Sequence, residues 1–95
     1  PLAVSNYPNP FNPSTVITLR FGGDDPYGTR QVDISVYGVD GRLVKDLYSG
    51  AVSGDSFSGL WDGTDDRGIS VSSGLYFYRV MSGRNAMNGK MLLLR

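Results

Sequence analysis

The chain reads GLWDGTDDRGISVSSGLYFYRV from residue 59 to residue 80, a stretch that holds its only tryptophan and a loop dense in Asp and Gly. Glycine reaches positive φ without steric cost and Asp caps turns, so Asp62-Gly63 and Arg67-Gly68 predict tight turns. After Gly74, a strand places Tyr76, Tyr78 and Val80 on one face. We interpret the stretch as strand, polar loop, a short rung near Val71, turn and long strand. Its residues are typical of strands and turns that build a fold, and not of a catalytic site.

The bulk composition bounds the kind of protein. Ninety-five residues with 40% hydrophobic content suit one small domain. Nine basic and nine acidic residues cancel, which argues against a nucleic-acid surface and against attraction to an anionic membrane. The sequence has no Cys and no His, which removes disulfides, most zinc sites and the commonest general base. No apolar run is long enough to cross a membrane.

The chain opens on Pro1-Leu2-Ala3-Val4 and shows no signal peptide. We therefore expect residues 1–95 to be a single domain excised from a longer secreted protein.

Residues 1–14 form a Pro-rich strap. Prolines at positions 8, 10 and 13 exclude helix and remove three backbone donors. Two large aromatic residues in a free linker would favour aggregation, so we expect Tyr7 and Phe11 to anchor the strap on a sheet edge. The alternative is a plain linker rich in Pro and Asn.

Period-two alternation predicts strands over residues 15–21, 31–37, 42–48, 56–61, 74–81 and in a last strand within 85–95. Asp40-Gly41 predicts a two-residue hairpin turn, and breakers predict loops over 22–29 and 49–55. This spacing predicts an all-β, antiparallel immunoglobulin-like sandwich of about seven strands. The pattern Tyr76-x-Tyr78 resembles the tyrosine-corner strand of such sandwiches.

The Asp-rich loop is a candidate calcium site. Asp62, Asp65 and Asp66 offer hard oxygen ligands, although their spacing does not match an EF-hand. The alternative, which we favour, is that these side chains cap their own turns and that the domain holds no cofactor. Asp24 and Asp25 form a weaker version of the same pattern.

Catalysis is not expected. A pair of acid/base carboxylates needs a pocket that separates their pKa values, and tight turns do not provide one. Without His, only Lys45 or Lys90 could activate a hydroxyl, and no Ser-Lys dyad is visible.

The aromatic residues are candidates for a polysaccharide-stacking platform. We expect most of them to fill the core, with Tyr37 and Phe77 the best exposed. The full set is Tyr7, Phe11, Tyr27, Tyr37, Tyr48, Phe57, Trp61, Tyr76, Phe77 and Tyr78.

The C-terminal run is apolar on both faces over residues 91–94 and ends at Arg95. An edge strand of this kind invites pairing with another chain and is normally blunted. It is therefore either a strand covered on both sides or a recognition element that docks by edge pairing and side-chain pockets.

Four blocks of the sequence carry a family resemblance. They are Asn6-Tyr7-Pro8-Asn9-Pro10-Phe11-Asn12-Pro13; Val32-x-Ile34-x-Val36-Tyr37 with Asp40-Gly41-Arg42-Leu43-Val44; Trp61-Asp62-Gly63-x-Asp65-x-x-Gly68 with Ser73-Gly74-x-Tyr76-Phe77-Tyr78-Arg79-Val80; and Lys90-Met91-Leu92-Leu93-Leu94-Arg95. In this order they resemble the type A C-terminal sorting domains of the type IX (Por) secretion system. The middle blocks are also similar to the immunoglobulin-like domain of the flagellar hook-capping protein.

The resemblance implies a non-catalytic sorting and surface-anchoring domain of an exported protein. Its implied partners are the parent cargo domain, the translocon and a sortase-like peptidase. The implied route runs through the periplasm to the cell surface or the medium. The implied signal is Lys90, Met91, Leu92, Leu93, Leu94 and Arg95, and the implied structural motif is Tyr7, Pro8, Pro10, Phe11, Trp61, Asp62, Gly63, Gly74, Tyr76 and Tyr78. The alternative is an accessory module that binds polysaccharide or spaces its parent.

Overall fold

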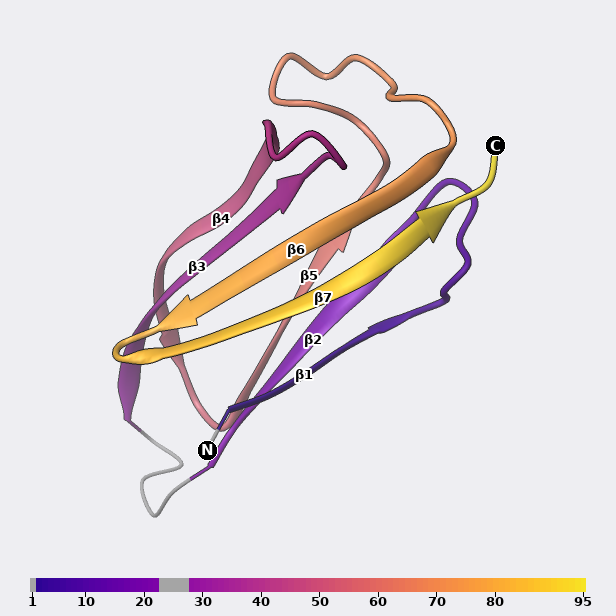
Figure 1. Cartoon of the computed structure of the whole chain (residues 1–95). Coiled ribbons are helices and arrows are strands. Elements are labelled where there is room, and N and C mark those ends of the chain that lie inside the picture. Colours follow the sequence, from indigo (N-terminus) through magenta and orange to yellow (C-terminus); the bar gives the residue numbers. More distant parts are fainter. Residues whose placement is uncertain (1, 23–27) are drawn as a thin grey trace.

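The computed structural model describes residues 2–22 and 28–95, which form seven strands in two antiparallel sheets (Figure 1). The strands are β1 (Leu2–Tyr7), β2 (Thr15–Phe21), β3 (Thr29–Tyr37), β4 (Leu43–Ser53), β5 (Ser56–Trp61), β6 (Gly74–Ser82) and β7 (Asn85–Leu93). One sheet has the order β1-β2-β5 and the other β4-β3-β6-β7. The predicted all-β sandwich is confirmed. The predictions for Asp24, Asp25 and Tyr27 fall outside the described residues.

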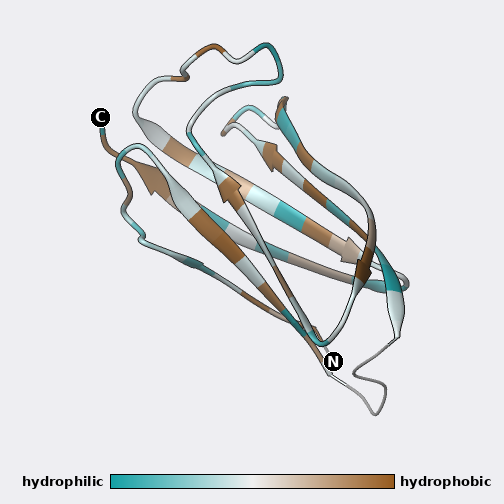
Figure 2. Cartoon of the chain, turned by 180° about the vertical axis from the view of Figure 1, so that it is seen from behind, coloured by the Kyte–Doolittle hydropathy of each residue, from teal (hydrophilic) through white to brown (hydrophobic). Residues whose placement is uncertain are grey.

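The core lies between the two sheets and is built by period-two alternation. Val32, Ile34 and Val36 of β3 are fully buried, as are Ile17 and Leu19 of β2. Figure 2 shows the resulting alternation of hydrophobic and hydrophilic residues along the strands. No helix among the described residues is long and apolar enough to span a membrane.

Trp61 lies at the centre of an aromatic cluster at one end of this core. Its ring lies 5.5 Å from that of Phe11 and 5.2 Å from that of Tyr76, the latter pair edge to face. The Tyr76 hydroxyl donates a hydrogen bond of 2.7 Å to the Ser72 carbonyl, a short distance upstream. This bond is the tyrosine corner that the pattern around Tyr78 predicted.

Two predicted loops differ from the structure. Residues 49–53 continue β4, because Ser49 to Ser53 pair in register with β3 and this pairing overrides their weak strand propensity. The Asp40-Gly41 turn forms, with Gly41 at φ +81°, but the connection covers residues 38–42 and is not a two-residue hairpin. Its bonds run from Gly41 N to the Gly38 carbonyl and from Gly38 N to the Arg42 carbonyl, each 3.0 Å.

Two smaller predictions also change. Tyr7 does not anchor the strap: it ends β1, faces solvent and is 81% exposed. Alternation explains this position, because Leu2 and Val4 of β1 pack toward the core and Tyr7 has the opposite parity. The short rung predicted near Val71 forms as one antiparallel bridge between Thr64 and Ser70, outside the named strands, and the Val71 N–H donates to the Gly63 carbonyl at 3.0 Å.

Candidate recognition site at the C-terminal strand

The strand β7 forms one edge of the four-stranded sheet. Of the predicted signal, residues 90–95, the side chains that lie on β7 alternate between the core face and the outer face of this sheet. Met91 and Leu93 are fully buried in the core. Lys90 and Leu92 have the opposite parity, with Lys90 exposed and Leu92 half-buried. Leu94 follows the strand and is 49% exposed. Two of the six predicted signal residues therefore build the core.

The backbone edge of β7 is occupied by the Pro-rich strap. Phe11 N donates to the Leu92 carbonyl and Leu94 N donates to the Phe11 carbonyl, each at 2.9 Å. The side-chain amide of Asn9 adds two bonds: it accepts from Leu92 N at 3.0 Å and donates to the Lys90 carbonyl at 3.1 Å. Edge pairing with a partner at residues 90–94 would therefore have to displace these contacts. In Figure 1 the strap runs beside the C-terminal end of β7.

Other contacts fix the strap in this position. Phe11 is 2% exposed and packs on Trp61, so it pins the strap to the sheet edge. The buried hydroxyl of Thr15 donates to the Pro8 carbonyl at 2.7 Å and accepts from the Asn6 amide at 3.2 Å. Nothing in the sequence pattern singled out Asn9, because its role depends on the approach of β7.

Arg95 joins the C-terminus to the Asp-rich loop. Its guanidinium donates to the Gly63 carbonyl at 2.6 Å and to the Val71 carbonyl at 2.5 Å. Its backbone N–H donates to the Ser73 hydroxyl at 2.9 Å. The last residue is thus bound by its own domain.

The carboxylate of Asp62 caps its own turn. It accepts from the N–H of Thr64 at 3.2 Å and from the Thr64 hydroxyl at 2.5 Å. The hydroxyl bond holds the pKa of Asp62 below its usual range, since it favours the ionised carboxylate. The Trp61 indole donates to the Thr64 carbonyl at 2.9 Å, which ties this turn to the core.

The other two acids of the loop are also bonded to backbone. Asp65 accepts from Ile69 N at 3.0 Å and from Arg67 N at 2.9 Å, and these bonds, the one from Ile69 first, lower its pKa. Asp66 accepts from Asp46 N at 2.9 Å and so holds the loop on β4. Within residues 2–22 and 28–95, no three Asp, His or Cys residues gather as a metal site would require.

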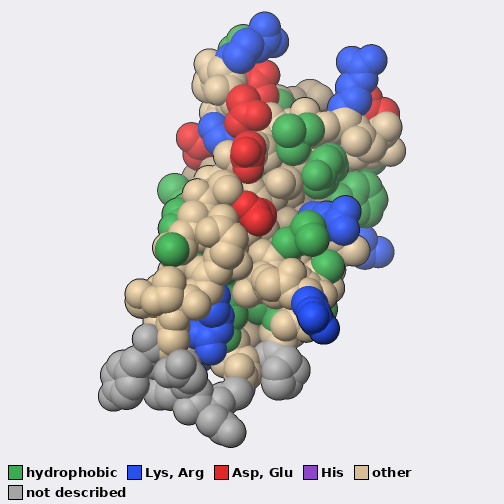
Figure 3. Space-filling view, turned by 90° about the vertical axis from the view of Figure 1, so that its left-hand side faces the viewer, with side chains coloured by type: hydrophobic (Ala, Val, Ile, Leu, Met, Phe, Trp, Pro, Cys, Tyr) green, Lys and Arg blue, Asp and Glu red, His purple; other side chains and the backbone are tan. Residues whose placement is uncertain are grey.

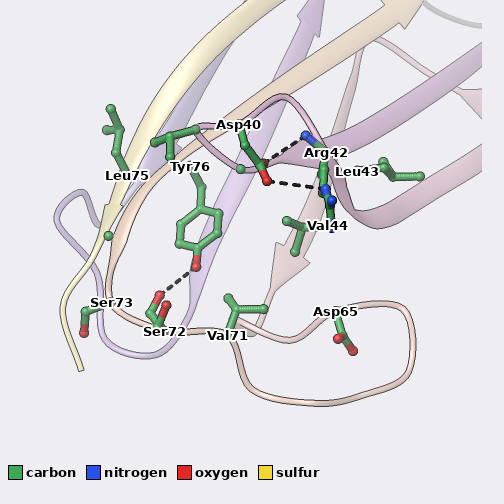
Figure 4. A pocket seen from close by; sticks show the side chains of 13 residues that line it. Asp40, Arg42, Leu43, Val44, Asp65, Val71, Ser72, Ser73, Leu75 and Tyr76 are labelled. Atoms are coloured by element: carbon green, nitrogen blue, oxygen red, sulfur yellow. Dashed lines mark hydrogen bonds and ion pairs between the residues drawn. The ribbon is translucent and has the colours of Figure 1, made fainter.

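A hollow of about 460 Å³ lies between the 38–44 hairpin and residues 71–76 (Figure 4). It contains two carboxylates, Asp40 and Asp65. Asp40 accepts from Arg42 N at 3.1 Å and pairs with the Arg42 guanidinium at 3.6 Å. Asp65 accepts from Ile69 N at 3.0 Å within its own loop. The two acids therefore do not form a pair arranged for acid/base chemistry.

The outer face of the four-stranded sheet carries Phe77 and Tyr37, although the most exposed aromatic ring among the described residues is Tyr7 on the other sheet. Phe77 is 37% exposed and lies opposite Tyr37 on one side and Lys90 on the other. Tyr37 is half-buried, whereas Tyr76 and Tyr78 face the core as predicted. Arg79 and Asn88 are cross-strand partners beside Phe77, and no local sequence pattern marks them as a pair.

One family model matches nearly the whole chain. The model of the secretion system C-terminal sorting domain matches residues 5–93. The structure of dimeric latent PorU from Porphyromonas gingivalis is similar, with a TM-score of 0.76 and 26% identity over 98% of this chain and 9% of that chain. No match is found among curated proteins.

Two further structures show the shared fold alone. PorZ, an essential surface component of the type IX secretion system of P. gingivalis, has a TM-score of 0.61 and 21% identity over 98% of this chain and 12% of that chain. The DNA glycosylase AlkC of Pseudomonas fluorescens has a TM-score of 0.56 and 14% identity over 99% of this chain and 30% of that chain.

The chain spans only a small part of PorU and PorZ, so the similarity concerns one domain of each. The match of the family model over nearly the whole chain decides the assignment. The chain belongs to the family of C-terminal sorting domains of the type IX (Por) secretion system, generally non-catalytic domains that mark cargo proteins for export to the cell surface or the extracellular space.

Proposed function

We propose that the sorting signal of this domain is read from the outward side chains of Lys90, Leu92 and Leu94. The observation that carries this proposal is the occupied edge of β7: the strap already bonds the outward backbone groups of residues 90–94. Met91 and Leu93 are buried, and Arg95 is held by the Asp-rich loop. A partner that meets the folded domain therefore has these three side chains to contact.

In this proposal the partner is the translocon of the secretion system, which the domain meets in the periplasm while joined to its parent cargo. A sortase-like peptidase then removes the domain as the cargo is anchored. Asp62 and Asp65 cap their own turns and Asp40 pairs with the exposed Arg42, which supports a domain in which these carboxylates have structural roles.

The test is a reporter fusion. Residues 1–95 are attached behind a periplasm-targeted fluorescent protein in a bacterium that has type IX secretion. We expect the reporter at the surface or in the medium, and expect it to stay in the periplasm of a translocon mutant. Export that persists in the translocon mutant would contradict the sorting role.

Deletion of residues 90–95 is a poor second test, because it removes Met91 and Leu93 from the core. The double variant Leu92→Ser and Leu94→Ser leaves those core residues in place. The control is Leu60→Ser, since Leu60 is 59% exposed and lies on β5 of the other sheet. We expect loss of export only in the double variant. Equal export from both variants, each shown to be folded, would place the signal elsewhere.

A second candidate function is polysaccharide binding, favoured by the exposed ring of Phe77 beside Tyr37. Sugar rings stack on exposed aromatic faces. A pull-down with insoluble polysaccharide tests this second function. Binding by the wild-type domain that Phe77→Ser abolishes would support an accessory module. Absence of binding by the wild-type domain would contradict polysaccharide binding.

A further inference from the structure

Two adjoining hollows cross the outer face of β6 and β7. One, of about 530 Å³, lies between the 38–41 hairpin and Phe77, and the other, of about 350 Å³, reaches from Phe77 to Lys90. They share Phe77 and Asn88, so they form one groove that passes over the Phe77 ring. We call this surface the Phe77 groove.

The strand register sets the composition of the groove. Tyr37, Phe77 and Lys90 form one cross-strand row, and Arg79 and Asn88 form the neighbouring row. The adjacent pair Leu75 and Leu92 extends the apolar surface toward the C-terminus. The groove is thus continuous with the outward side chains of the proposed sorting signal.

The charge in the groove has one sign. Arg79 and Lys90 are both exposed, and neither forms an ion pair with any residue in the described part of the chain. Among those residues no Asp lines either hollow. Acidic residues lie on the same outer face but outside the two hollows: Asp33 of β3 accepts from the Ser49 hydroxyl, and Asp46 of β4 lies across Ser35 from Arg79. Figure 3 shows acidic side chains along the middle of its view and hydrophobic side chains near Lys and Arg at the right, with a further acidic side chain at the upper right.

We infer that the Phe77 groove binds an acidic polypeptide segment that also carries an apolar or aromatic side chain. This inference rests on the proposed sorting function and names the chemistry of the partner. The apolar side chain packs on Phe77 and Tyr37, while the carboxylates pair with Arg79 and Lys90. The charged side chains that line the groove, Arg79 and Lys90, are both basic, which favours an acidic polypeptide over a neutral sugar chain.

The experiment uses the reporter fusion with Arg79→Glu and Lys90→Glu combined. Two attractions become repulsions, so we expect the exported fraction to fall by about tenfold or more. The charge-conserving pair Arg79→Lys and Lys90→Arg keeps export. The matched control is Arg20→Glu, because Arg20 is exposed on β2 of the other sheet and its side chain makes no hydrogen bond or ion pair in the described structure.

A photo-crosslinker at position 77 then identifies the chemistry of the partner. Benzoylphenylalanine keeps an aromatic ring there, and the crosslinked peptide captured during export is mapped by mass spectrometry. We expect a peptide of net negative charge whose capture the double charge reversal removes. A basic or neutral peptide, or an adduct to glycan or lipid alone, would overturn the inference.

The outcomes separate the two proposals. If the wild-type fusion is not exported by the translocon, the sorting function fails. If the wild type is exported and the folded charge-reversed variant is exported equally well, the acidic partner is wrong while the sorting function stands.

Discussion

The guanidinium of Arg95 donates a hydrogen bond of 2.6 Å to the carbonyl of Gly63, thirty-two residues earlier in the chain. The C-terminal residue and the turn after Trp61 therefore stabilise each other. This contact connects the Asp-rich loop to the segment that follows β7.

Gly63→Ala should destabilise the domain by roughly 1–3 kcal/mol. Gly63 has φ +76°, and an added Cβ would lie 2.7 Å from Arg95 Nη2 and 3.1 Å from the Pro13 carbonyl. The control is Gly68→Ala, at φ +79° with nothing within 4 Å of the added Cβ. Urea unfolding of both variants measures the difference. Equal losses would show that crowding against Arg95 adds nothing to the cost of the backbone conformation.

Asn9→Ala should release the strap from β7. The variant loses two hydrogen bonds to the strand edge, each worth about 0.5–1.5 kcal/mol, and leaves Leu92 N without its partner. Hydrogen exchange at the Leu92 amide should accelerate more than at Leu94, whose amide is held by Phe11. Asn12→Ala is the control, since Asn12 is exposed and makes no side-chain hydrogen bond among the described residues. Unchanged exchange at the Leu92 amide would contradict the role of the Asn9 side chain in holding the strap on β7.

Local patterns predicted most of the fold. Alternation placed Val32, Ile34 and Val36 in the core, and the turn residues located the Asp40-Gly41 connection. The prediction failed at β4, where Ser49 and Gly50 have the composition of a loop but pair with β3. Strand pairing is a long-range contact, and local propensity does not report it.

The candidate site was predicted less completely for the same reason. The apolar run over residues 91–94 indicated an edge strand, and β7 is one. The predicted anchoring of the strap on a sheet edge by Phe11 is confirmed, whereas the two bonds of Asn9 to β7 depend on the approach of segments about eighty residues apart in sequence. The grouping of Arg79 with Lys90 likewise needs the register of β6 and β7.

Acid should loosen the Asp-rich loop. The pKa values of Asp62 and Asp65 lie below their ordinary value of 3.8, because hydrogen bonds favour the ionised carboxylates. Their contribution to stability is therefore full above about pH 4, the unfolded-state pKa, and is lost as the pH falls through the lower folded-state values. Urea midpoints measured from pH 6 down to about pH 2 test this sign. The variant Asp62→Asn with Asp65→Asn should show a shallower decline, and an equal decline would assign the effect to other carboxylates.

Calcium should not raise the unfolding temperature of the domain. A ligand that binds only the folded state stabilises it in proportion to the logarithm of its concentration over Kd. Asp62, Asp65 and Asp66 each already accept backbone N–H bonds, so a calcium ion would have to compete with the turns for the same oxygens. Thermal unfolding with millimolar calcium, against magnesium and against chelator, measures the effect. A rise specific to calcium that Asp65→Asn removes would establish a site at this loop, and would mean that the turn bonds and the ion share those carboxylates.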